Sequence, residues 1–246
     1  MMSMLTQIFV RRYAHHHALL IVFLSSAIWG VLWVPMRYAE SFGISGLWVV
    51  TLFHVLPAIA ILPFIARAYI ADRQHRLVSF IAGGLLGCLL VMRVNSLSFD
   101  YDKADLLGLA AGMAWALGSE FIRRFPNADF LHITFMQYSV GGLLAGTAAF
   151  VMGDMFPETH RLIAVLPVAF LASTVVFLPS VLLIFRIMQY VSPGLVGILM
   201  LSEVLVAALS SWLFLQEALT LSQWAGVLAI LGTGVFVGLT EKAAES

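Results

Sequence analysis

Long, uninterrupted apolar runs are the feature that most constrains how this chain folds. A helix needs about 20 apolar residues to cross a bilayer. Within the runs apolar residues follow one another, as from Leu162 to Ala172, whereas the strands of a membrane barrel alternate apolar and polar residues. The sequence therefore predicts an all-α polytopic membrane protein with eight transmembrane helices. They are expected at about 18–38, 46–68, 77–97, 105–122, 130–152, 163–188, 194–215 and 222–240.

The composition agrees with this class of protein. Of the 246 residues, 61% are hydrophobic and only 11% are charged, whereas a soluble domain carries about 25% charged residues. Basic and acidic residues are equal in number, so no net charge would attract nucleic acid. Cys88 is the only cysteine, which excludes internal disulfides and a thiolate metal cage. We therefore expect no metal, no cofactor and no nucleic-acid partner, and a lipid bilayer as the surroundings.

The basic residues predict the orientation in the membrane. The first apolar run has no small-residue cleavage site, so we expect a retained helix rather than a signal peptide. With the N-terminus inside, nine basic side chains fall on the cytoplasmic side and four fall outside, as the positive-inside rule requires. The nine are Arg11, Arg12, Arg67, Arg73, Arg76, Arg123, Arg124, Arg186 and Lys242, and the four are Arg37, Arg93, Lys103 and Arg161. Both termini are therefore predicted to be cytoplasmic, in the cell (inner) membrane.

Residues recur in the same order in the two parts of the chain, which indicates a duplicated unit. The matched pairs are Trp29 and Trp115, Arg37 and Arg123, Thr51 and Thr134, His54 and Gln137, and Arg93 and Arg186. On the predicted topology the two copies are inverted, as in many secondary transporters, which bind substrate near the midplane where the halves meet. We expect a shortened three-helix repeat at 1–99, a five-helix repeat at 104–240 and a cytoplasmic tail at 241–246.

The chain resembles the EamA family of the drug/metabolite transporter superfamily. The residues that carry the resemblance are Trp29-Gly30 in the first span, Glu203 to Leu209, Gln216 to Thr220, and Trp224 to Gly226. The similarity extends from about 18 to 240. It implies ten helices in two inverted five-helix repeats, of which two helices are missing here. It also implies the export of small metabolites, amino acid-like compounds or drugs, so we expect a small-molecule substrate.

Two departures from the family pattern leave an alternative open. The family usually has proline after the glutamate of the penultimate helix, whereas Val204 stands here, so we expect no kink at that point. The missing helices would have helped to build the cavity opposite Glu203. The alternative is a shortened, transport-inactive member or a helper subunit. The apolar flank left by the missing helices would then favour a homodimer or another membrane partner.

Glu203 is the sharpest candidate for function. It lies midway along the span at 194–215, where a charged side chain costs about 3 kcal/mol on insertion scales. The small and polar residues Ala207 and Ser210 share its helical face and could line a cavity. Glu203 could bind and release a proton during transport, or hold a cationic group of a substrate. The alternative is a carboxyl group that only holds helices together.

Polar and aromatic residues in other spans are further candidates. His54 and Gln137 occupy matching places in the second and fifth spans and could face one shared cavity, with Tyr138 as an aromatic wall. The alternative is a hydrogen bond between helices, worth about 1 kcal/mol. Trp29 and Trp33 are expected on one face of the first helix together with Arg37, and they either line the cavity or anchor the helix in the membrane. The same choice applies to Trp115, the repeat partner of Trp29.

Other motifs point to packing rather than to chemistry. The Gly142-x-x-x-Gly146 motif and three others like it let helix backbones approach closely. Glu120 lies one helical turn from Arg123 and Arg124, which favours a local ion pair. The sequence contains neither His-Glu-x-x-His nor Gly-x-Ser-x-Gly, the motifs of zinc proteases and serine hydrolases. We therefore predict that the protein is not an enzyme.

Overall fold

The computed structural model describes residues 4–68, 101–125, 129–189, 191 and 193–215, and isolated residues between 220 and 232. Within these residues the structure is helical and contains no strand, which confirms the all-α class. The predicted span at 77–97 and the tail at 241–246 lie outside the described residues, as does most of the span at 222–240. The chain forms two compact units, one of residues 1–31 and 191–246 and the other of residues 32–190.

Unit 1 contains three described helices. They are α1 (Met4–Trp29), α9 (Pro193–Met200) and α10 (Ser202–Leu215). Helix α1 packs against both α9 and α10. Pro193 is the first residue of α9, where the missing N–H of proline is not needed for helical hydrogen bonding.

The predicted first span is not one continuous helix. Helix α1 begins at Met4 and ends at Trp29, and α2 (Trp33–Glu40) follows after a turn. In the turn the N–H of Gly30 donates to the carbonyl of Ala27, three residues earlier, at 3.0 Å, whereas an α-helical bond would reach back four residues. Pro35 explains the break, because in a continuous helix its ring would crowd the carbonyl of Val31. The expectation of one continuous helix through Trp29, Trp33 and Arg37 is therefore wrong, and the shared face stays a prediction.

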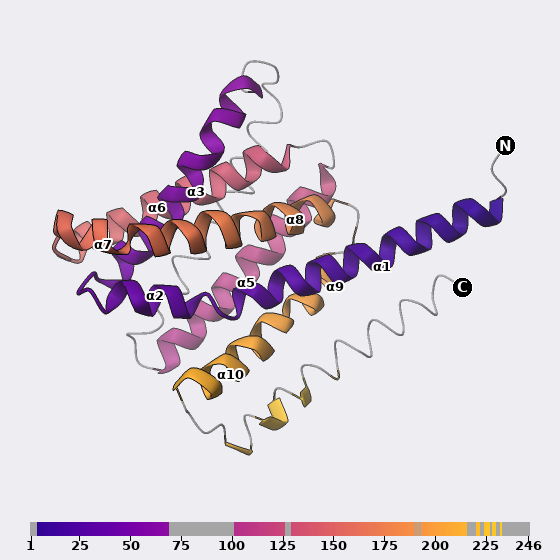
Figure 1. Cartoon of the computed structure of the whole chain (residues 1–246). Coiled ribbons are helices and arrows are strands. Elements are labelled where there is room, and N and C mark those ends of the chain that lie inside the picture. The colour runs from indigo at the N-terminus through magenta and orange to yellow at the C-terminus, as the bar shows by residue number, and fades with distance from the viewer. Residues whose placement is uncertain are drawn as a thin grey trace. The chain divides into compact units, whose positions relative to one another are not determined.

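Unit 2 consists of the remaining described elements. They are α2, α3 (Gly46–Ala68), α5 (Tyr101–Arg124), α6 (Phe130–Val151), α7 (Thr159–Phe170), the π-helix η2 (Leu171–Phe177) and α8 (Leu178–Met188). Helices α3 and α6 form the most extensive helix contact of the unit. The α7–η2–α8 segment forms one continuous rod, drawn in orange in Figure 1, which contacts α3 through α7 and η2 and contacts α6 through α8.

A proline accounts for the π-helical part of this rod. Pro179 follows η2 closely and has no N–H to donate to the carbonyl of Val175, which its ring would crowd in an α-helix. The wider π turn relieves that crowding, and the N–H of Leu178 donates to the carbonyl of Ser173, five residues earlier. The predicted span at 163–188 is thus helical throughout, but it is not a uniform α-helix.

Apolar side chains from α2, α3, α7 and the loop between α2 and α3 form a core in unit 2. Its buried members are Ala39, Ile44, Val49, Phe53, Val165 and Ala169. Four described stretches are long and apolar enough to cross a membrane: His17–Glu40, Gly46–Ile65, Thr159–Met188 and Gly194–Phe214. Helix α6 has the length to cross, with 22 residues, but it buries polar residues such as Thr134 and Gln137. The expected count of eight helices remains a prediction.

Candidate functional site

Gly30 brings α1 into backbone contact with α10 in unit 1. A Cβ atom placed on Gly30 would lie 2.6 Å from the carbonyl oxygen of Glu203 and 2.7 Å from the backbone nitrogen of Ala207. Real Cβ atoms essentially never come that close to another atom. The Trp-Gly pair of the sequence therefore has a structural reason, since only glycine permits this approach.

Serine hydroxyls join the same elements on either side of this contact. Ser202 Oγ donates to the carbonyl of Phe23 at 2.9 Å, and Ser210 Oγ donates to the carbonyl of Gly30 at 3.2 Å. Ser210 also lies 3.0 Å from the carbonyl of Ala207 in its own helix. Ser26, one turn after Phe23, is fully buried, and its hydroxyl has no hydrogen-bond partner. Ser210 is thus placed between α1 and α10, and its assignment to a substrate pathway remains a prediction.

Glu203 lies at an interruption in the predicted seventh span. Helix α9 ends at Met200, and α10 begins at Ser202 with Glu203 in its first turn. At the break, the N–H of Val204 donates to the carbonyl of Leu201, three residues earlier, at 3.1 Å. The helix is therefore interrupted here although the proline is absent, and the expectation of no kink stays a prediction. An acidic side chain in the first turn interacts favourably with the helix dipole, and Glu203 is half-buried.

In unit 2, α3 and α6 run antiparallel and share a polar interface. A Cβ on Gly142 would lie 3.2 Å from His54 Cβ, and one on Gly146 would lie 3.5 Å from Thr51 Cγ2. The predicted packing role of this glycine motif is confirmed by these contacts. Tyr138, one turn before Gly142, presents its ring edge-on to the His54 ring at a centroid distance of 5.6 Å.

The threonines and the buried polar side chains of α3 and α6 differ in whether their polar atoms have hydrogen-bond partners. Thr51 donates to the carbonyl of Leu47 at 2.8 Å, and Thr134 donates to that of Phe130 at 2.7 Å, so each hydroxyl is bonded within its own helix. His54 and Gln137, which follow these threonines by three residues, are both buried. His54 Nε2 and Gln137 Oε1 have no hydrogen-bond partner.

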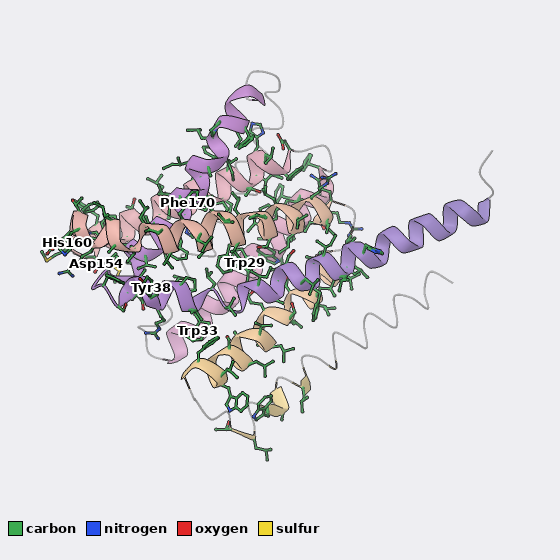
Figure 2. All side chains as sticks on the ribbon, viewed as in Figure 1. Trp29, Trp33, Tyr38, Asp154, His160 and Phe170 are labelled. Atoms are coloured by element: carbon green, nitrogen blue, oxygen red, sulfur yellow. The ribbon has the colours of Figure 1, made fainter. Side chains whose placement is uncertain are left out.

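One end of unit 2 is closed by contacts between two loops. The Ser45 hydroxyl, just before α3, donates to the Asp154 carboxylate at 2.6 Å, and Trp48 Nε1 lies 3.4 Å from the Asp154 carbonyl. Arg161 lies 3.3 Å from the carbonyl of Gly43, a residue with a positive φ of 76°. Asp154 lies beside the start of α7 (Figure 2). The predicted topology puts both loops on the outer side.

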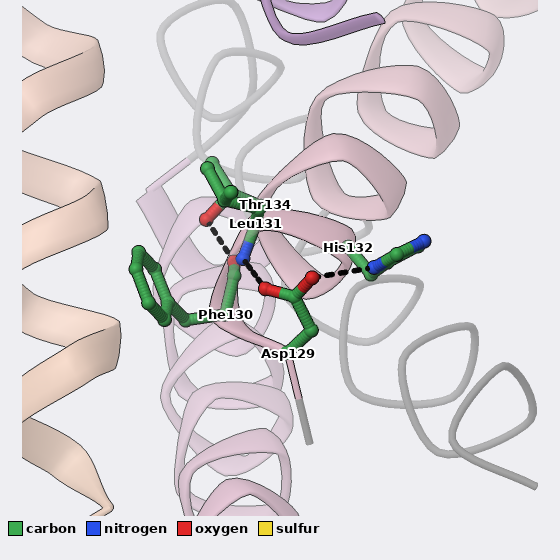
Figure 3. Close-up of polar contacts among 5 residues, drawn as sticks. All are labelled: Asp129, Phe130, Leu131, His132 and Thr134. Atoms are coloured by element: carbon green, nitrogen blue, oxygen red, sulfur yellow. Dashed lines mark hydrogen bonds and ion pairs between the residues drawn. The ribbon is translucent and has the colours of Figure 1, made fainter. Parts of the chain in front are cut away.

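The opposite end of α6 is held by a side-chain cap. The Asp129 carboxylate accepts the N–H of Leu131 at 2.9 Å, which satisfies one free donor of the first turn. Its other oxygen lies 2.9 Å from Nδ1 of His132 (Figure 3). The sequence analysis singled out neither Asp129 nor His132. The Asp-x-Leu-His start of the apolar run is a capping pattern that could have revealed it.

Helix α5 contributes the last predicted site residue. The Trp115 ring lies 6.3 Å from the ring of Phe185 on α8, and the Ser119 hydroxyl donates to the carbonyl of Trp115 at 2.7 Å. Near the end of α5, Arg124 Nε lies 3.0 Å from Glu120 Oε1, which confirms the predicted local ion pair. Trp115 therefore packs against the α7–η2–α8 rod, and whether it also lines a substrate pathway stays a prediction.

Comparison with protein families adds evidence that is independent of this geometry. A family model described as the EamA-like transporter family matches residues 102–239, more than half of the chain. Residues 1–101 lie outside the match. Neither the search of curated proteins nor the search of solved structures found a match.

Proposed function

The chain belongs to the EamA-like transporter family, and on that premise we propose that it is a secondary-active exporter of small metabolites, amino acid-like compounds or drugs. The family establishes a multi-pass membrane transporter of the drug/metabolite superfamily, and the resemblance noted in the sequence is confirmed. Its members are transporters rather than enzymes. The class of substrate, the export direction and the energy source belong to the proposal.

The observation that carries the proposal is the position of Glu203. A carboxyl group in the first turn of α10, directly after the break at Leu201, resembles the discontinuous helices of secondary transporters, whose half-helix ends form substrate and ion sites. An ionisable residue inside a membrane span is a candidate for proton transfer. Glu203 is proposed to take up and release the proton that drives export.

Glu203→Gln tests the coupling, because it keeps the size and hydrogen bonding of the side chain but removes its titration. The purified protein is reconstituted in liposomes, and efflux of compounds from an amino acid and drug panel is measured over a range of pH. Wild-type flux should depend on the proton gradient, and the variant's flux should not. Glu120→Gln is the matched control, since Glu120 pairs with exposed Arg124 in its own helix. Flux through Glu203→Gln that still follows the proton gradient refutes the coupling.

The remaining candidate residues are proposed to line the substrate pathway. They are His54, Gln137, Tyr138, Trp29, Trp33, Trp115 and Ser210. Both termini are proposed to be cytoplasmic in the inner membrane. The hydrogen bond between Ser45 and Asp154 supports the part of this topology that puts their two loops on the same side of the membrane. In a Cys88→Ser background, single cysteines at Glu158 and Arg124 test the topology. A membrane-impermeant thiol reagent should label the first from outside and the second only from inside.

A second candidate function is favoured by the extent of the family match. Because residues 1–101 lie outside the match, the chain could be a transport-inactive member or a helper that pairs with a second copy or another membrane protein. Crosslinking in native membranes tests this function. A crosslinked species together with no flux in liposomes supports the helper function. Detection of the monomer alone contradicts it.

A further inference from the structure

Two buried atoms of unit 2 lack a hydrogen-bond donor. His54 Nδ1 lies 2.8 Å from the carbonyl oxygen of Val50, which only accepts, so Nδ1 carries the hydrogen. In the neutral ring, Nε2 then has a lone pair and no hydrogen. Gln137 Oε1 is an amide oxygen and is also an acceptor. Both atoms are buried without a partner, so both lack the same kind of group.

The hydroxyls at the matching places on α3 and α6 do not supply that donor. Thr51 and Thr134 precede His54 and Gln137 by three residues, and each directs its one hydrogen to a carbonyl of its own helix. The Tyr138 ring meets His54 edge-on and follows Gln137 directly in α6. Both unsatisfied acceptors therefore belong to the contacting helices α3 and α6, and the His54 ring contacts the residue that follows Gln137.

The chemistry of the two atoms defines the group that would complement them. A buried acceptor without a donor is rare in folded proteins and calls for a specific cause, such as a ligand. Neither atom carries a hydrogen, so a carboxylate or another acceptor would meet lone pairs. An amine or ammonium group offers several N–H donors and is therefore complementary to each of the two atoms.

We propose that His54 Nε2 and Gln137 Oε1 form an acceptor site that takes the amine end of a small molecule. The inference rests on the proposed function, because it treats that molecule as the transported substrate. It deepens that function by requiring N–H donors on the substrate, and not merely positive charge.

Four probes with similar aromatic bodies test the proposal on the unchanged protein. They are phenethylamine, its N,N,N-trimethyl derivative, 3-phenylpropionate and propylbenzene. Binding is measured by calorimetry and by thermal unfolding in detergent, where a ligand of the native state raises the melting temperature. Phenethylamine should bind, whereas the trimethyl derivative keeps the charge without N–H groups and should bind at least about tenfold more weakly. Equal binding of these two, or equal binding of all four probes, overturns the proposal; the latter is expected if a buried water satisfies both acceptors.

Variants locate the binding. His54→Phe and Gln137→Leu keep approximate volume and remove one acceptor each, so each should abolish the preference for the amine. Without ligand, both should melt higher than wild type, because an unsatisfied buried polar atom is removed. If one molecule contacts both atoms, the double variant should lose no more affinity for phenethylamine than either single variant loses. Losses of affinity that add up in the double variant overturn a shared site.

Thr51→Val is the matched control, since the Thr51 hydroxyl is bonded within α3. It should keep the preference for phenethylamine, and loss of the preference there overturns the assignment to His54 and Gln137. Flux in liposomes is measured separately. Selective amine binding without flux supports the site and contradicts the proposed function, whereas flux without amine selectivity supports the function and overturns the site.

Discussion

The α1–α10 contact of unit 1 and the α3–α6 contact of unit 2 are built in different ways. In the first, a glycine touches backbone atoms of the partner helix, and the Ser202 and Ser210 hydroxyls donate to carbonyls of the α1 segment. In the second, glycines touch side chains, and the threonine hydroxyls are bonded within their own helices. The difference indicates that the first contact fixes backbones closely, whereas the second leaves buried polar atoms available.

This contrast separates two roles that polar residues take in membrane helices. A hydroxyl that bonds to a partner carbonyl contributes to helix association, at about 0.6 kcal/mol on average. A buried acceptor without a donor destabilises the fold by about 1–3 kcal/mol. His54 and Gln137 belong to the second kind, so the α3–α6 interface is less stable than its extent alone would suggest.

Gly30→Ala should have the largest effect. Its Cβ would overlap backbone atoms of Glu203 and Ala207, which have no rotamer through which to move away. We expect a loss of about 3 kcal/mol or failure to fold, measured as thermal unfolding and monodispersity in detergent. Gly197→Ala in α9 is the control, because nothing lies within 4 Å of its added Cβ. A Gly30→Ala protein as stable as wild type would show that Gly30 and the backbone of α10 do not approach as closely as the structure indicates.

Gly142→Ala should be milder, since the added Cβ would meet side-chain atoms of His54 and Val55 at 3.2 and 3.3 Å. We expect a loss of about 1–2 kcal/mol, offset in part by the better helix propensity of alanine. Gly146→Ala, whose nearest contact would be an ordinary 3.5 Å, should be neutral or slightly stabilising in the same melting experiment. If Gly146→Ala is the more damaging of the two, α3 and α6 approach each other differently from the structure.

Asp154→Ala should destabilise the end of the α3–α6 pair. The substitution removes the acceptor of the Ser45 hydroxyl, at a cost of about 1 kcal/mol because the group is only partly buried. Thermal unfolding of Asp154→Ala, Ser45→Ala and the double variant forms a cycle that isolates the pair. Losses of stability that are strictly additive would show that the Ser45–Asp154 hydrogen bond does not stabilise the protein.

Ser210→Ala should have the smallest effect, about 0.6 kcal/mol for one hydrogen bond between helices. The comparison variant is Ser119→Ala, whose buried hydroxyl donates to Trp115 in its own helix and, among the described residues, to no other helix, so it should matter less. Equal melting temperatures for the two variants would mean that the Ser210–Gly30 bond contributes nothing to joining α1 and α10.

The residues show which parts of the fold could be predicted from the sequence. Apolar length located α3 and α6 to within a few residues, because membrane spans depend on length and hydropathy. The break after Trp29 was missed although Gly30 and Pro35 stand in the sequence, since both were counted as part of one apolar run. The break at Leu201 has no proline or glycine beside it, so no local sequence signal marks it.

The candidate site was predictable to a similar extent. The repeat pattern selected His54 and Gln137 as equivalent positions, and the structure buries both. Their lack of a donor was not predictable, because it depends on where the Thr51 and Thr134 hydroxyls turn and on the bond from His54 to Val50. Asp129 was missed because it caps a helix and is not a charge inside a span, although its place before an apolar run is a capping signal.

The serine bonds of unit 1 also have a consequence for the order of biosynthesis. Ser202 and Ser210 lie 179 and 180 residues after the carbonyls to which they donate. A ribosome adds about 5–20 residues per second, so α1 waits roughly 10–40 seconds before its partners exist. For that time the segment around Ser26 and Gly30 lacks the α10 residues that contact Gly30 in the finished unit. Unit 1 can therefore be completed only after the whole of unit 2 has been made.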